Sequence, residues 1–180
     1  MSIFSIVGKN EIIEQILSGY KQPLENDLIK YSNHVQRVYQ FCTLLDPESD
    51  HPEKYAIASA FHDLGIWTHN TFDYLRPSIS LARDWLLANN KKSLVAEISL
   101  MIEMHHKLTR YNGRFSTVET FRKADWIDLT LGLFKFGIDR NHIQKIMRRF
   151  PTKGFHRFLI LESSKNLLRN PFRPLPMFRR

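Results

Sequence analysis

The chain has 180 residues, enough for one domain with a sizeable core, and its apolar and charged fractions are ordinary for a globular protein. It carries 26 Lys and Arg against 18 Asp and Glu, a net charge of +8, and its only cysteine, Cys42, excludes an intramolecular disulfide and a thiolate metal cluster. No apolar run reaches the roughly 18 residues of a membrane-spanning helix. The N-terminus lacks the basic region of a secretory signal, so we expect a cytoplasmic protein.

Hydrophobic periodicity predicts helices and no strands, and therefore an all-α, single-domain helical bundle. We expect this domain to span residues 1–168 and a basic, proline-rich tail to occupy residues 169–180. A loop is expected over residues 66–76. The predicted helices cover residues 10–20, 26–45, 52–64, 77–88, 93–106, 117–137, 139–149 and 152–168.

The second predicted helix carries an inward-facing histidine. His34 lies three residues after Tyr31 and four before Val38, so it shares their apolar face. Taken alone, such a residue is also compatible with a neutral core histidine bonded to a carbonyl.

The third predicted helix is nearly apolar all round and ends in Phe61-His62-Asp63-Leu64-Gly65. A helix of that kind is central to its fold, so His62 and Asp63 would be costly to bury without a partner. A divalent cation is the simplest compensation. Gly65 is interpreted as the stop of this helix.

Two further ionisable elements follow on apolar helix faces. His105 continues one face of its helix and His106 the adjacent side, so one of them should point inward, and the sequence does not say which. Asp125 lies four residues after Phe121, in the middle of a packing face, and Asp128 follows one turn later. Pairing with Arg122 or Lys123 is the structural alternative for these carboxylates, and Gly137 is expected to end the helix.

Together these elements predict a metal site in the core of the bundle. Mixed imidazole and carboxylate ligands suit Mn, Fe, Co, Ni or Zn, and Mg is also compatible.

The order His34 … His62-Asp63 … Asp125 resembles the H…HD…D motif of the HD superfamily of metal-dependent phosphohydrolases, over residues 26–135. The resemblance implies an all-helical fold in which these four residues bind a divalent metal. It also implies hydrolysis of a phosphomonoester or phosphodiester, such as a nucleotide, by metal-activated water. We expect His105 or His106 to act as acid/base or substrate contact, and Lys107 and Arg110 to stabilise the phosphoryl oxygens.

Binuclear members of that superfamily, including the HD-GYP phosphodiesterases, carry a further histidine in the helix after the HD loop. The corresponding stretch here, residues 76–79, has none, which favours a mononuclear site, although His69 or Asp73 could substitute.

Three other interpretations of the sequence are possible. The first is an HD-type diiron oxygenase, and the second is a non-catalytic HD-like regulatory or binding module. The third is nucleic-acid binding through the basic C-terminal end: residues 140–180 hold eleven Lys and Arg and one acidic residue, Glu162, but no recognisable binding motif. The sequence identifies neither the substrate nor the oligomeric state.

Overall fold

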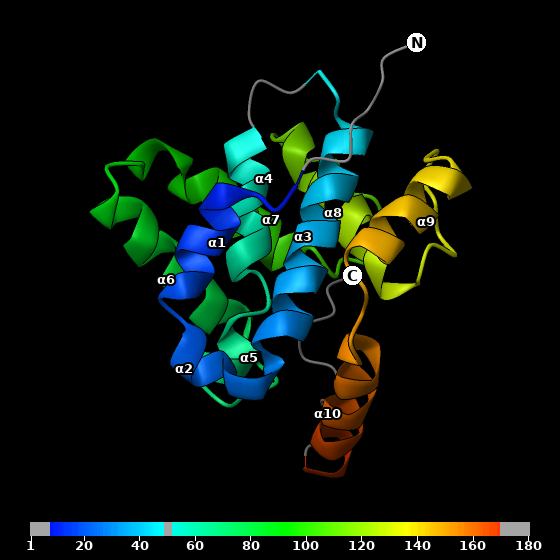
Figure 1. Ribbon diagram of the computed structural model, residues 1–180. Helices are drawn as coiled ribbons and strands as arrows, with labels where there is room; N and C mark the ends of the chain where they lie inside the picture. The colour runs from blue at the N-terminus through cyan, green and yellow to red at the C-terminus, as the bar shows by residue number, and fades with distance from the viewer. Residues whose placement is uncertain (1–7, 49–51, 170–180) are drawn as a thin grey trace.

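The computed structural model describes residues 8–48 and 52–169, and these residues form an all-helical bundle without strands (Figure 1). The predicted all-α, single-domain fold is thereby confirmed, while residues 170–180 of the predicted tail lie outside the described residues. No described helix is both long and apolar enough to cross a membrane. The α-helices are α1 Glu11–Ser18, α2 Lys21–Leu24, α3 Leu28–Leu45, α4 Pro52–Phe61, α5 Gly65–Thr68, α6 Leu75–Ala88, α7 Val95–Met104, α8 Ser116–Leu129, α9 Arg140–Arg149 and α10 Phe155–Arg169.

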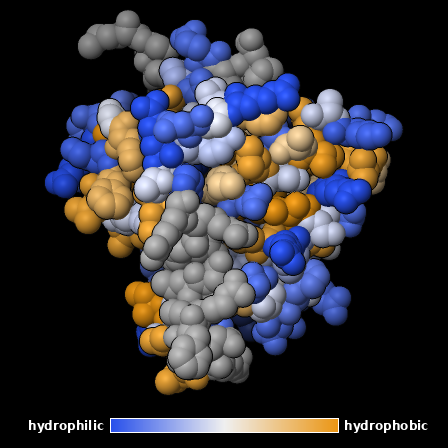
Figure 2. All heavy atoms as spheres, turned by 180° about the vertical axis from the view of Figure 1, so that it is seen from behind, coloured by the Kyte–Doolittle hydropathy of each residue, from blue (hydrophilic) through white to orange (hydrophobic). Residues whose placement is uncertain are grey.

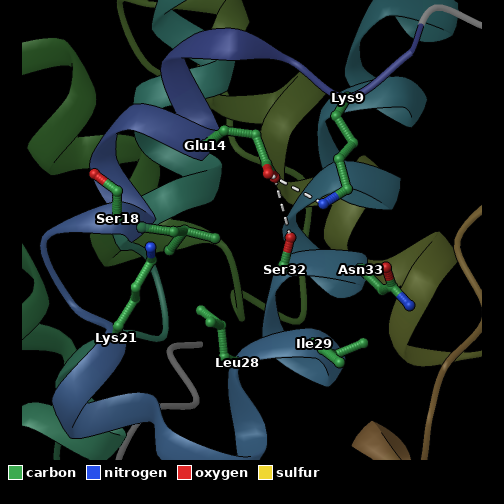
Figure 3. A pocket seen from close by; sticks show the side chains of 9 residues that line it. Lys9, Glu14, Ser18, Lys21, Leu28, Ile29, Ser32 and Asn33 are labelled. Atoms are coloured by element: carbon green, nitrogen blue, oxygen red, sulfur yellow. Dashed lines mark hydrogen bonds and ion pairs between the residues drawn. The ribbon is translucent and has the colours of Figure 1, made fainter.

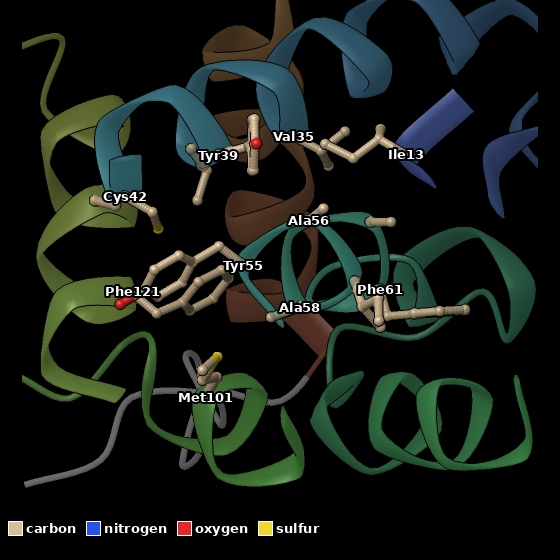
Figure 4. Close-up of a cluster of buried hydrophobic side chains, with 14 of the residues drawn as sticks. Ile13, Val35, Tyr39, Cys42, Tyr55, Ala56, Ala58, Phe61, Met101 and Phe121 are labelled. Atoms are coloured by element: carbon tan, nitrogen blue, oxygen red, sulfur yellow. The ribbon is translucent and has the colours of Figure 1, made fainter. Parts of the chain in front are cut away.

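Helices α3, α4, α7 and α8 surround a common core. Helix α3 packs against α8 and α4, and α7 packs against α6 and α8, while α1 covers α3 and α4. Figure 4 shows side chains from all four core helices pointing into the same interior, among them Val35, Cys42, Ala58, Met101 and Phe121. These four helices therefore enclose one buried interior.

The helix starts follow from local chemistry. The Asn10 side chain accepts hydrogen bonds from the backbone N–H groups of Ile12 and Ile13, which caps α1. Asp139 caps α9 in the same way through Asn141. Pro52 begins α4, where its missing N–H has no consequence.

The interpretation of Gly65 as a helix stop is wrong. Helix α4 already ends at Phe61, and Gly65 begins the short helix α5 inside the stretch predicted to be a loop. A Cβ on Gly65 would lie 2.6 Å from the carbonyl oxygen of Tyr74 and 2.9 Å from Oγ of Ser78. The glycine is needed for the close approach of α6, whose Ser78 hydroxyl accepts the Gly65 N–H at 2.9 Å.

The predicted end of α8 at Gly137 is also wrong. The helix ends at Leu129, because Gly132 adopts a φ of +78° and its N–H donates to the carbonyl of Ile127 at 2.8 Å. Gly132 also packs against Ile143 of α9, so the early stop brings α9 back onto the bundle.

Several large hydrophobic side chains remain on the surface, and the face in Figure 2 carries hydrophobic side chains interleaved with hydrophilic ones. The exposed ones concentrate between α8 and α9 and on the outer side of α10, which extends below the rest of the bundle in Figure 1. These residues are Leu131, Leu133, Phe134 and Phe136, and Ile160, Leu161, Leu167 and Leu168.

The substitution Gly65→Ala should lower the free energy of unfolding by roughly 1–3 kcal/mol, because the new methyl group overlaps a backbone carbonyl that cannot move freely. Urea denaturation measures the change. Gly8→Ala is the control, since nothing lies within 4 Å of a Cβ at Gly8. Equal stability of the two variants would contradict the close-packing explanation.

Candidate metal centre

The structure brings together six ionisable side chains that the sequence singles out. They come from the middle of α3, the turn after α4, the turn after α7 and the middle of α8. All six are buried, with exposed fractions of 6% or less. They are His34, His62, Asp63, His105, His106 and Asp125.

Both histidines of the His105-His106 pair face this interior, although helical spacing predicted only one. Helix α7 ends at Met104, and the pair lies in the turn that follows, where both side chains are buried. Their ring centroids are 3.9 Å apart.

Three histidines are anchored through the same ring nitrogen, Nδ1. The Nδ1–H group of His62 donates to the carbonyl of Ser59 at 2.8 Å, and that of His105 donates to the carbonyl of Ile102 at 2.7 Å. The Nδ1–H group of His34 donates to Asp128 Oδ2 at 2.6 Å. With Nδ1 occupied in this way, each ring directs its Nε2 lone pair into the site.

The two carboxylates each face two groups of histidines. Asp63 Oδ2 lies 3.5 Å from Nε2 of His34 and 3.4 Å from Nε2 of His62, while its Oδ1 lies 3.4 Å from Nε2 of His105. Asp125 Oδ1 lies 3.5 Å from Nε2 of His62, and its Oδ2 lies 3.6 Å from Nδ1 of His106. Each carboxylate therefore spans the space between the His34–His62 pair and the His105–His106 pair.

These atoms lack the positive charge that their arrangement requires. Nε2 of His34 and Nε2 of His62 are only 2.9 Å apart, a distance at which two lone pairs repel unless a cation or a proton lies between them. Asp63 Oδ1, Asp125 Oδ2 and His105 Nε2 are buried without a hydrogen-bond partner. Three overlapping groups of ligand atoms within 4.8 Å of one another could hold a metal: His34, His62 and Asp125; His62, Asp63 and His105; His105, His106 and Asp125. A divalent cation with nitrogen and oxygen ligands fits this set.

The pKa values show the same demand for positive charge. Burial lowers the pKa of His34, but its hydrogen bonds to Asp128 and Asp63 outweigh burial and raise the pKa to about 9. Burial raises the pKa of Asp63, yet the surrounding histidines hold that pKa well below its usual value. Both carboxylates are thus held as anions among imidazoles, a set of groups whose charge a bound cation would balance.

An ion pair behind His34 was missed by the sequence analysis. The buried Arg37 donates through Nε to Asp128 Oδ1 and through Nη2 to Asp128 Oδ2 at 2.9 Å, and its Nη1 donates to the carbonyl of Phe150 at 2.8 Å. Asp128 therefore pairs with Arg37 and His34, whereas Arg122 pairs with Glu119. The spacing could have indicated this pair. His34 and Arg37 are three residues apart on α3, and Asp125 and Asp128 are three residues apart on α8, which packs against α3.

Aromatic rings close the site. The Phe155 ring stacks on His34 at 4.0 Å between centroids, and the Tyr74 hydroxyl is 2.7 Å from Nε2 of His106. Trp67 of α5 stacks on Phe158 of α10 at 5.1 Å, which fixes the start of α10 beside the site.

The other predicted site residues are more exposed than the six residues of the cluster. Lys107 is half-buried and Arg110 is exposed, so their role as phosphate contacts stays a prediction. His69 and Asp73 are exposed and belong to none of the three ligand groups in the described residues, so neither supplies the extra ligand.

Cavities also lie outside the cluster, two of them beside α1 and α5. One of about 350 Å³ lies between α1 and α3 (Figure 3), and its carboxylate, Glu14, already accepts from Lys9 at 3.0 Å and Ser32 at 3.3 Å. The other, of about 260 Å³, lies between α5 and α10 and is lined by Trp67, Asn70 and Phe158, among others. Two of its lining residues, Ile66 and Trp67, follow the His62-Asp63 turn in the chain.

Comparison with protein-family models, with curated proteins and with solved structures found no match for this chain.

Replacing Arg37 by Met should lower the free energy of unfolding by roughly 3–5 kcal/mol, because Asp128 would keep a buried charge without its guanidinium partner. The double variant Arg37→Met/Asp128→Asn removes that charge and should recover most of the loss. Urea denaturation checks both, with the exposed Arg83→Met as control. A loss below about 1 kcal/mol for Arg37→Met would show that the pair is not structural.

Proposed function

We propose that this chain is a metal-dependent phosphohydrolase of the HD superfamily type, acting on a phosphomonoester or phosphodiester such as a nucleotide. One observation carries the proposal. Three Nε2 lone pairs, from His34, His62 and His105, and two carboxylates, from Asp63 and Asp125, converge in a buried site. Their order along the chain is that of the H…HD…D motif.

In this proposal His34, His62, Asp63 and Asp125 hold the metal. A divalent cation held there would lower the pKa of a water molecule and so provide a nucleophile near neutral pH. Asp128 and Arg37 keep the His34 ring turned so that Nε2 faces the site. His106, fixed by the Tyr74 hydroxyl, is positioned to hold or move a proton at Nδ1.

The number and kind of bound metal ions would distinguish a phosphohydrolase from an oxygenase. Because Asp63 and Asp125 each face both histidine pairs, the cluster also has the donors for a second ion beside His105 and His106. Two irons would favour the HD-type diiron oxygenase over a hydrolase.

The closed site requires movement before a substrate enters. The ligands are almost fully buried, and Phe155 at the start of α10 covers His34. The cavity between α5 and α10 is where a phosphate ester would approach in this proposal, once α10 shifts.

Elemental analysis of the purified protein should find about one equivalent of Mn, Fe, Co, Ni or Zn, and Asp63→Ala and Asp125→Ala should each lose it, whereas two equivalents of iron would favour the oxygenase. Metal loss should be accompanied by at least a hundredfold fall in kcat for p-nitrophenyl phosphate or its bis ester, because water is no longer activated. Asp73→Ala, at an exposed carboxylate close in the chain, should keep both metal and activity. A wild-type protein that binds no metal after reloading would sink the proposal and leave a helical binding module.

Tyr74→Phe tests the positioning of His106. Loss of the 2.7 Å hydrogen bond should lower kcat roughly 10–100-fold while Asp63 and Asp125 still hold the metal. Parallel metal analysis and thermal denaturation separate this effect from misfolding. Unchanged kcat with retained metal would remove His106 from the mechanism.

A further inference from the structure

The connection between α8 and α9 exposes an unusual amount of hydrocarbon. Within residues 131–136, here called the apolar loop, Leu133 is 75% exposed, Leu131 59%, Phe134 49% and Phe136 39%. A cluster of large apolar side chains in so short a segment marks an interaction site more often than an isolated exposed leucine does.

The exposure is imposed by an ordered turn. The backbone N–H of Leu133 donates to the Thr130 carbonyl at 3.0 Å, and that of Phe134 donates to the Thr130 hydroxyl at 3.2 Å. Leu131 and Phe136 have φ values of 53° and 45°, in the left-handed region that large side chains avoid. The fold therefore holds these side chains outward at the expense of local backbone strain.

Cations surround the apolar loop. The partly exposed Lys123 lies over the Phe136 ring, 5.9 Å from its centroid. Arg122 also lies 5.8 Å from that centroid, but it is buried and paired with Glu119, so it is not available to a ligand. Leu131 and Arg148 line the same groove of about 490 Å³, and Lys135 lies within the loop. The loop and α9, residues 130–149, contain five Lys and Arg against one acidic residue, Asp139, which caps α9.

We propose that the apolar loop and its flanking cations bind the surface of an anionic lipid bilayer, with Leu133 and Phe134 inserted below the headgroups. Leucine side chains offer neither hydrogen bonds nor stacking to nucleic-acid bases, whereas they gain free energy in the acyl region. Lys123, Lys135 and Arg148 remain at the level of the lipid phosphates, where each adds electrostatic attraction. The attachment is peripheral and independent of the proposed hydrolase activity, so it can be tested without a substrate.

Co-sedimentation with vesicles tests the inference. The full chain should bind phosphatidylcholine vesicles that contain phosphatidylserine, bind pure phosphatidylcholine weakly, and dissociate as salt is raised. The double variant Leu133→Ser/Phe134→Ser should weaken the partition constant by at least roughly tenfold, because it removes the inserted side chains. Ile29→Ser/Leu87→Ser, which changes two exposed apolar residues elsewhere, should bind like the wild type.

A fluorescent label separates insertion from simple charge attraction. Cys42 is fully buried, so a thiol-reactive environment-sensitive dye will report on Leu133→Cys, with Leu87→Cys as the matched control. Insertion predicts brighter, blue-shifted emission at position 133 alone. Absence of vesicle binding, binding that survives Leu133→Ser/Phe134→Ser unchanged, or a self-associated species that this double variant abolishes would each overturn the proposal. The last result would identify a second copy of the chain as the occupant.

Discussion

The carboxylates of Asp63 and Asp125 lie where α3, α4, α7 and α8 would otherwise meet in hydrocarbon. Buried anions in that position need positive charge or hydrogen bonds to be stable, and the surrounding histidines are the groups that can provide them. His34, His62 and His105 are each anchored at Nδ1, so their second nitrogens can only face the carboxylates. The cluster thus makes the packing of these four helices dependent on a balance of charge at their centre.

Helix periodicity predicted most of this arrangement. The inward direction of His34 and Asp125 follows from their spacing to apolar neighbours, and the structure places both in the core. What periodicity could not supply was tertiary contact. Gly65 and Gly132 have their roles because of residues on other helices, and an arginine such as Arg37 is expected at the surface unless its buried carboxylate partner is known. That both His105 and His106 are buried at the site depends on the packing around the end of α7, which the unbroken apolar pattern did not indicate.

The contacts that stabilise the position of α10 also block access of a substrate to the buried cluster. The Phe155 ring on His34 and the Trp67–Phe158 stack bury the cluster and hold α10 against the bundle. The remainder of α10 exposes Ile160, Leu161, Leu167 and Leu168, so this helix is secured mainly at its first turns. The element that covers the cluster is therefore also the one whose outer half is least embedded in the core.

The Arg37–Asp128–His34 chain has an evolutionary consequence. Asp128 is shared between a guanidinium and an imidazole, both buried, so a change at either end alters the charge that the other experiences. Single substitutions at position 37 or 128 should be counter-selected, whereas a paired replacement by neutral residues is tolerated by the packing. In a family descended from this chain, positions 37 and 128 should therefore vary together, and position 34 should limit which pairs are allowed.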